Sequence, residues 1–179
     1  MKIVAHLERF IGKISEVIEI VDRKHKISIS LFENVPFEGV RTYCTLGLNK
    51  FFLDYYYEFV FVCGSNFNQN EIASFLTSFS EFLIEEKTSV LQGDILSFDF
   101  TLTSETKMNS LYFTLPFYFD HDFQDLHLED RAVIFPLIVP VYHQEALLIR
   151  EKGWNSFEDF LEENDVDNLW DLNRDPLHW

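Results

Sequence analysis

One helix-type segment between two groups of strand-type segments is the feature that most restricts how this chain can fold. The apolar side chains of residues 69–87 recur every three or four positions, as expected for a helix that buries one face. They are Ile72, Phe75, Leu76, Phe79, Phe82 and Leu83. Asn68, followed three residues later by Glu71, is typical of a helix start. We therefore predict a helix over 69–87 that covers one face of a sheet.

Strand-type segments lie on both sides of this helix. Residues 26–32 alternate isoleucine or leucine with serine, which is the period of a half-exposed strand. Other segments are rich in the β-branched and aromatic residues that favour strands. The expected strands are 26–32, 40–48, 55–63, 95–103, 111–119 and 132–141.

Helices are also expected towards both ends of the chain. Residues 4–21 carry apolar side chains at three- and four-residue steps, which predicts an amphipathic helix. After Pro140 ends a strand, the pattern turns helical as far as Gly153, which can adopt the left-handed conformation that ends helices. Asn155 or Ser156 then caps a second short helix.

The order of these elements predicts an α+β fold, a single-domain, mixed, largely antiparallel β-sheet flanked by helices in an α/β sandwich. No repeat, low-complexity tract or linker divides the chain, so we expect one domain over residues 1–179. Its last part, about residues 165–179, is expected to be a loosely held acidic tail. Cys44 and Cys63 lie in different expected strands without metal-binding spacing, which favours two reduced, packed thiols.

Charge is distributed unevenly along the sequence. The first 60 residues carry eight basic and eight acidic side chains, so the remaining residues carry the whole net charge of −16. A negative field of this size repels nucleic acid and anionic lipid, and it accelerates the encounter with a basic protein. We therefore expect a basic protein partner, with no direct nucleic-acid partner and no membrane partner.

The sequence also bears on where the protein acts. No stretch approaches the roughly 20 apolar residues that cross a bilayer. Glu8 and Arg9 interrupt any signal-peptide core near the amino terminus. These features predict a cytoplasmic protein.

Patterns that would indicate catalysis are weak. The six glycines form neither a phosphate-binding loop nor the turn that exposes a nucleophilic serine. The loop "DHDFQDLHLED" places His121 and His127 among carboxylates, and His143 stands two residues before Glu145, but neither spacing is that of a known metal site. We expect no enzyme activity, catalytic residue, metal or cofactor. A hydrolase or metal enzyme built on these histidines is the least favoured of three hypotheses.

Acidic side chains lying among aromatic ones form a more informative pattern. Among the last 22 residues eight are acidic and only Arg174 is basic. Aromatic anchors with charged surroundings are typical of protein-binding surfaces, although acidic faces often serve solubility alone. The candidate partner-binding residues are Asp120, Asp122, Asp125, Glu129, Asp130, Trp154, Glu158, Asp159, Glu162, Glu163, Asp165 and Asp167.

Three blocks of sequence remain to be considered, namely "PFEGVRTYCTLGL" (36–48), "LYFTLPF" (111–117) and "PLIVPVYHQEALLIREKGWNSFEDFLEENDVDNLWDLNR" (136–174). Taken in this order, they resemble the suppressor-of-fused-like family. The resemblance is greatest to short bacterial members, which are immunity proteins or antitoxins encoded beside polymorphic toxins. The matching positions are Gly39, Thr45, Leu46, Gly47, Leu48, Pro116, Phe117, Pro140, Glu145, Gly153, Asp167 and Arg174.

This resemblance implies a mixed α/β sandwich without enzymatic activity that binds and neutralises another protein. In the bacterial members the partner is a toxin domain, often a nuclease, so the resemblance implies a cognate toxin that is blocked by steric and electrostatic occlusion. Strand addition at a sheet edge is a second mode of binding that the family implies. The alternative function is a regulatory module that sequesters an endogenous factor or peptide, which the same fold would serve.

Overall fold

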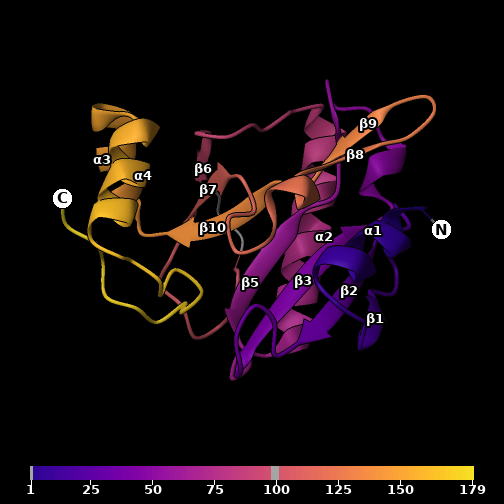
Figure 1. Cartoon of the computed structure of the whole chain (residues 1–179), viewed down its shortest axis with the longest axis horizontal. Helices are drawn as coiled ribbons and strands as arrows, with labels where there is room; N and C mark the ends of the chain where they lie inside the picture. The colour runs from indigo at the N-terminus through magenta and orange to yellow at the C-terminus, as the bar shows by residue number, and fades with distance from the viewer. Residues whose placement is uncertain (1, 98–100) are drawn as a thin grey trace.

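The computed structural model describes residues 2–97 and 101–179 (Figure 1). The helices in this part of the chain are α1 (Lys2–Phe10), α2 (Gln69–Glu86), α3 (His143–Lys152), α4 (Trp154–Glu163) and the short 3-10 helices η1 (Leu48–Lys50) and η2 (His121–Phe123). The strands are β1 (Glu16–Glu19), β2 (Ser28–Glu33), β3 (Val40–Leu46), β4 (Tyr56–Tyr57), β5 (Val60–Gly64), β6 (Ile95–Ser97), β7 (Ser110–Thr114), β8 (Asp125–His127), β9 (Ala132–Ile134) and β10 (Leu137–Val141).

Seven of the described strands form one sheet in the order β1-β2-β3-β5-β10-β7-β6. Neighbouring strands in it are antiparallel except β5 and β10, which run parallel. The other three described strands form a small sheet in the order β4-β9-β8. The expected α+β fold with a mixed, largely antiparallel sheet is confirmed.

Helix α2 covers one face of the large sheet and lies behind β3 and β5 in Figure 1. It begins where the sequence predicts, because the side-chain oxygen of Asn68 accepts hydrogen bonds from the backbone N–H groups of Asn70 (2.9 Å) and Glu71 (3.4 Å). Successive strand residues point to opposite faces of the sheet. Phe61 accordingly packs on the α2 side, whereas Val60 lies in the core on the other side.

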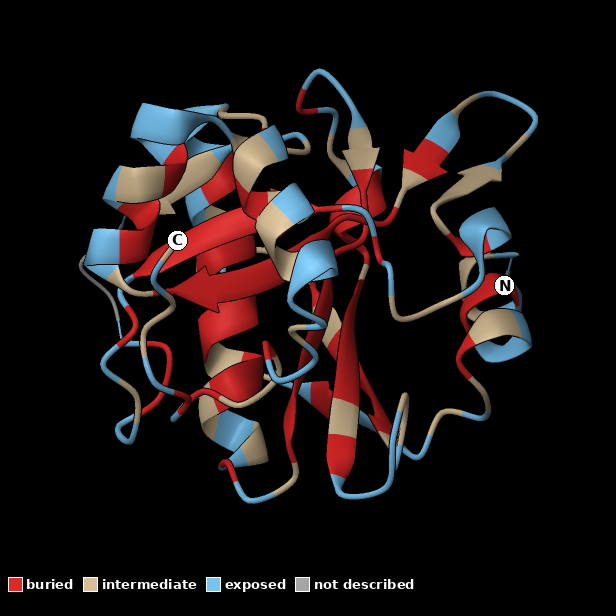
Figure 2. Cartoon of the chain, turned by 60° about the vertical axis from the view of Figure 1, so that its left-hand side comes forward, coloured by how far each residue is buried: buried red, intermediate tan, exposed pale blue. Residues whose placement is uncertain are grey.

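The opposite face of the large sheet is covered by α1, α3, α4 and the small sheet. Figure 2 shows buried segments running through the sheet and along the inner sides of the helices, with exposed residues on their outer sides. The large sheet therefore lies between two layers, as in the α/β sandwich that the element order predicts.

The amino-terminal helix is shorter than predicted. Helix α1 ends at Phe10 instead of continuing through 4–21, and the chain then forms β1, in which Ile18 pairs with Ile29 of β2. Gly12 has a φ of +120°, which no helix residue adopts. The three- and four-residue spacing of the later isoleucines is therefore not helical, and pairing with β2 decides the local structure.

Several predicted strands differ from the observed ones. Segments 55–63 and 132–141 each contain two strands, one in each sheet. Pro136, which has no backbone N–H, lies between β9 and β10. Strand β7 ends at Thr114, well before residue 119. Of segment 95–103, β6 covers 95–97, residues 98–100 lie outside the described residues, and 101–103 is not a strand.

The carboxyl-terminal part also differs in detail. Strand β10 extends through Pro140 to Val141. Gly153 ends α3 with a φ of +89° and also caps α4, which begins at Trp154, so neither Asn155 nor Ser156 is the capping residue. The segment after α4 is not loosely held, because the side chains of Leu169 and Leu172 are buried in the core.

Two further expectations concern the cysteines and membrane segments. Cys44 and Cys63 are buried free thiols, as predicted. Burial raises the pKa of the Cys63 thiol to about 12, which keeps it protonated and unreactive. Among residues 2–97 and 101–179, no helix has the length and apolar character needed to span a membrane.

Candidate protein-binding site

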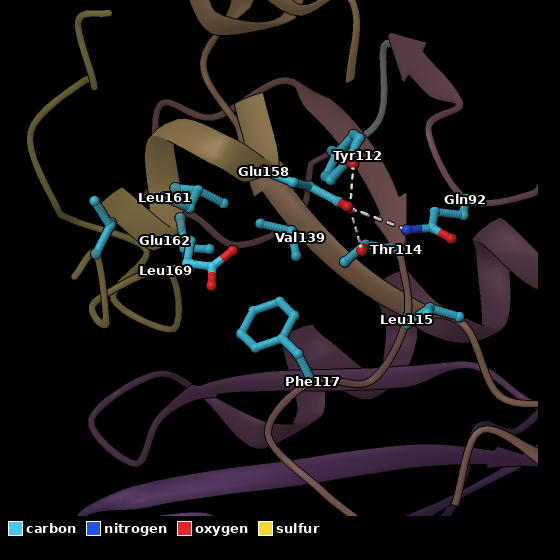
Figure 3. A pocket seen from close by; sticks show the side chains of 11 residues that line it. Gln92, Tyr112, Thr114, Leu115, Phe117, Val139, Glu158, Leu161, Glu162 and Leu169 are labelled. Carbon is cyan, nitrogen blue, oxygen red and sulfur yellow. Dashed lines mark hydrogen bonds between the residues drawn. The ribbon is translucent and has the colours of Figure 1, made fainter. Parts of the chain in front are cut away.

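A pocket of about 350 Å³ lies between β7, β10, α4 and the segment that follows α4 (Figure 3). Its walls are mostly apolar side chains. Gln92, Tyr112, Thr114 and Glu158 lie together on one side, and Glu162 lies apart from them, beside Leu161 and Leu169 (Figure 3). The lining residues are Gln92, Tyr112, Thr114, Leu115, Phe117, Val139, Glu158, Leu161, Glu162, Val166 and Leu169.

The secondary structure explains why these side chains converge. Tyr112 and Thr114 are two residues apart on β7 and therefore point to the same face. Val139 of β10 pairs with Tyr112 and adds an apolar group to that face. On α4, residues three and four positions apart share one side, so Glu158 and Leu161 both face the pocket.

The carboxylate of Glu158 is fixed by three neutral donors. Its Oε1 atom accepts hydrogen bonds from the hydroxyls of Tyr112 (2.6 Å) and Thr114 (2.6 Å), and its Oε2 atom accepts one from the side-chain amide of Gln92 (3.1 Å). Burial and the bond to Glu158 raise the pKa of Tyr112 far above its usual range, so this hydroxyl remains a donor. In the part of the chain that the structure describes, Glu158 has no ion-pair partner.

A second pocket of about 410 Å³ continues the first one and shares Gln92, Thr114 and Leu115 with it. Pro116, Asp125 and apolar residues of β9 and of the segment that follows it line its other side. We refer to the two pockets together as the groove. Leu115 and Phe117 at the groove are 44% and 51% exposed, and exposed apolar side chains that line a groove are typical of contact surfaces.

The structure brings together some of the candidate acids but not all of them. Glu158 and Glu162 line the first pocket, and Asp125 lines the second. The other candidate acids of α4 and the following segment, Asp159, Glu163, Asp165 and Asp167, are exposed and line neither pocket.

The remaining candidate acids make local interactions. The Asp120 side chain caps η2 by accepting a hydrogen bond from the backbone N–H of Asp122 (2.9 Å). Glu129 forms an exposed ion pair with Lys2, and Asp130 pairs with the adjacent Arg131. None of these four acids lines either pocket of the groove.

Trp154 is a partly buried packing residue. A Cβ atom at Gly93 would lie 2.5 Å from the indole Cδ1 of Trp154, so the ring lies directly against this glycine. The contact holds the start of α4 against the turn that precedes β6. Its part-buried position limits the area that Trp154 can offer to a partner.

The histidines named in the sequence analysis are scattered. His127 lies 2.9 Å from Asp125, the His121 side chain contacts Gln124, and His143 is exposed at the start of α3. The described residues contain no group of three or more histidine, cysteine, aspartate or glutamate side chains arranged to hold a metal ion.

Several family-pattern positions form two buried polar networks. In one, the carboxylate of Glu58 accepts hydrogen bonds from the Thr45 hydroxyl (2.6 Å) and from the backbone N–H groups of Gly47 (2.8 Å) and Asn49 (3.3 Å). In the other, Glu145 pairs with Arg174. The carboxylates of Glu58 and Glu145 are fully buried and support the fold, so they are not available to a ligand.

The other matching positions lie in turns, in the core and at the groove. Gly39 has a φ of +78° between β2 and β3, and Leu48 is buried. Pro116 and Phe117 line the groove.

A family model described as Suppressor of fused protein (SUFU) matches residues 23–175. The chain belongs to the suppressor-of-fused family. This confirms the resemblance seen in the three sequence blocks. One relative, Immunity protein YqcF of Bacillus subtilis (strain 168), is 23% identical in a 169-residue alignment that covers 87% of this chain and 84% of the relative.

Solved structures from the suppressor-of-fused family share the fold. A putative SUFU homolog from Neisseria gonorrhoeae FA 1090 superposes with a TM-score of 0.77 at 13% identity, over 99% of this chain and 95% of that one. A chain of the Sufu-Fu complex gives 0.70 at 14% identity, over 97% and 89%. Drosophila Suppressor of Fused gives 0.58 at 15% identity, over 83% of this chain and 42% of the larger protein.

Most of the groove was not predicted from the sequence. Glu158 and Glu162 were expected to bind a partner, but Gln92, Tyr112 and Thr114 were not. The one local indication was the period-two spacing of Tyr112 and Thr114 beside Leu115 and Phe117 in the "LYFTLPF" segment.

Proposed function

We propose that this chain is an immunity protein that binds a cognate toxin and neutralises it by occlusion. The observation that carries this proposal is the similarity, along 87% of the chain, to Immunity protein YqcF of Bacillus subtilis. In this proposal the chain acts in the cytoplasm as a single binding domain, without catalysing a reaction.

The distribution of charge supports a basic toxin as the partner. The net charge of −16 arises entirely after residue 60, and Asp159, Glu163, Asp165 and Asp167 expose their side chains around α4. Nuclease domains are commonly basic where they hold phosphate groups, so an acidic surface would be attracted to such a groove and would cover it. We therefore propose a nuclease as the toxin.

The groove supplies the apolar component that an interface of this kind needs. Leu115 and Phe117 are exposed at its edge, and Glu162 and Asp125 lie beside apolar walls. Stable interfaces combine a desolvated apolar centre with a charged rim. The edge strands β1 and β6 of the large sheet offer a second mode of contact, the addition of a strand from the partner.

Co-expression with the toxin encoded by the neighbouring gene tests the proposal. We expect growth to be restored in a sensitive host and a stable complex to elute as one peak in size-exclusion chromatography. A toxin from an unrelated locus, expressed in the same way, is the control and should still kill. Continued killing by the neighbouring toxin, with no complex, would contradict the proposal. Recovery of an endogenous regulator in a pull-down would instead support the regulatory alternative.

A further inference from the structure

The first pocket contains a carboxylate that the protein itself leaves without a cation. Glu158 accepts hydrogen bonds from Tyr112, Thr114 and Gln92, and all three donors are neutral. A carboxylate in an apolar pocket is stabilised further by a positive charge, because the surrounding side chains shield the pair from water. Throughout residues 2–97 and 101–179, no lysine or arginine forms an ion pair with it.

The shape and lining of the pocket specify the kind of cation. Val139, Leu161 and Leu169 form apolar walls, while Glu158 and Glu162 contribute carboxylates (Figure 3). A long side chain with an apolar stem and a charged end matches this arrangement, since its methylene groups contact the walls while its head meets the carboxylates. The volume of about 350 Å³ suits one or a few side chains.

We propose that this pocket binds a single arginine or lysine side chain of the toxin. The inference rests on the proposed function and names what the toxin inserts. The guanidinium or ammonium group lies between the carboxylates of Glu158 and Glu162, and the stem lies on Leu161 and Phe117. Arginine fits better than lysine because its planar group can donate to two oxygens at once and can also stack on an aromatic ring.

The pocket can be tested without the toxin by using amino-acid probes. We would titrate ¹⁵N-labelled protein with N-acetyl-arginine amide and, as a matched control, with N-acetyl-citrulline amide, which has nearly the same shape and no charge. The arginine probe should produce saturable shifts in the resonances of Gln92, Thr114 and Leu161, and the citrulline probe should produce much smaller ones. Equal responses to both probes, or shifts spread over the outer acids of α4, would overturn the inference.

Variants then separate this subsite from the proposed function. In Glu158→Gln the side chain keeps an oxygen that can accept from Tyr112 and Thr114, so the fold is retained while the charge is lost. Affinity for the arginine probe and for the toxin should fall by at least about tenfold. Glu162→Gln, which removes a charge from the pocket without touching these bonds, should weaken both to a smaller extent.

The outcomes distinguish two kinds of failure. If the toxin binds and Glu158→Gln leaves its affinity unchanged, the subsite inference is wrong while the immunity function stands. If the toxin is not bound at all, the proposed function is wrong, and the response to the arginine probe still decides whether the pocket binds a basic side chain.

Discussion

Arg174 and Glu145 form a fully enclosed salt bridge that joins the carboxyl-terminal segment to the start of α3. The guanidinium donates to both carboxylate oxygens, at 2.6 Å and 2.8 Å, and both side chains are 0% exposed. The same carboxylate accepts hydrogen bonds from the backbone N–H groups of Tyr142 (2.8 Å) and Leu177 (2.6 Å). One buried charge therefore organises the beginning of a helix and the last residues of the chain.

Replacing Arg174 by methionine should destabilise the protein strongly. The substitution keeps an apolar stem but leaves the Glu145 carboxylate buried without its cation, and breaking a buried pair in this way costs about 3–5 kcal/mol. Urea unfolding followed by circular dichroism measures the change in the free energy of unfolding.

Two further variants show whether the unpaired charge is the cause. Lys2→Met breaks an ion pair whose side chains are 64% and 92% exposed and should cost less than about 1 kcal/mol. Combining Glu145→Gln with Arg174→Met removes the buried charge and should recover part of the lost stability. Equal losses in Lys2→Met and Arg174→Met would contradict this account.

Glu58 should make the protein less stable as the pH rises. Burial raises the pKa of this carboxyl above the 4.5 of an exposed glutamate, even though hydrogen bonds from Thr45, Asn49 and Gly47 favour the charged form. The folded protein therefore holds this proton more tightly than the unfolded chain does. The stabilising contribution is complete below pH 4.5 and is lost as the pH rises through the folded-state pKa.

A glutamine at position 58 isolates this effect from the other carboxylates. The free energy of unfolding of the parent minus that of Glu58→Gln should decrease from about pH 4 to about pH 8, because only the parent ionises at this position. Urea unfolding of both proteins at several pH values within this range provides the measurement. Parallel pH profiles would show that the Glu58 pKa is not raised.

Gly93→Ala should destabilise the contact between α4 and the turn before β6. The new Cβ would meet three atoms of the Trp154 indole at 2.5–2.8 Å, and the backbone φ of +91° is unfavourable for alanine. Gly12→Ala is a matched control, since Gly12 has a φ of +120° but its added Cβ meets no atom within 4 Å. Thermal unfolding should show a loss for Gly93→Ala that exceeds the control by about 1–3 kcal/mol. Similar losses would mean that Trp154 moves aside without cost.

Local sequence patterns were sufficient for some elements and misleading for others. The apolar side chains at every third or fourth position and the capping residue Asn68 predicted α2, because both signals lie within the helix or directly before it. The prediction of a helix over residues 4–21 was wrong beyond Phe10, because Ile18 becomes a strand residue only through its pairing with Ile29 of β2. Register between separate segments is not encoded in the spacing within one of them.

The candidate site was only partly predictable for a similar reason. Counting acids near aromatic residues found Glu158, but its partners Thr114, Tyr112 and Gln92 are 44, 46 and 66 residues away along the chain. The spacing of residues within one segment cannot indicate hydrogen bonds to a residue so far away in the sequence. The family blocks included both Glu145 and Arg174, yet their direct pairing emerged only from the structure.

The exposed acids of α4 should act on the rate of toxin binding more than on the stability of the fold. Asp159 and Glu163 are exposed, line neither pocket of the groove and form no ion pair among the described residues. Charges of this kind accelerate encounter with an oppositely charged partner through long-range attraction. Such attraction is screened by salt, whereas contacts within a formed interface are screened much less.

A double charge reversal, Asp159→Lys with Glu163→Lys, should therefore slow association with the toxin by roughly threefold to tenfold at low salt. Glu86→Lys with Glu105→Lys makes the same change in net charge at exposed acids on α2 and in the segment before β7, so it reports the effect of overall charge alone. Surface plasmon resonance at about 0.01 M salt, where the Debye length is about 30 Å, and at about 1 M, where it is about 3 Å, provides the comparison. We expect the difference between the two variants to be large at low salt and to vanish at high salt, because of the four acids changed only Asp159 and Glu163 are on α4, the helix that lines the groove. An on-rate that falls equally in both variants would place the toxin elsewhere on the protein.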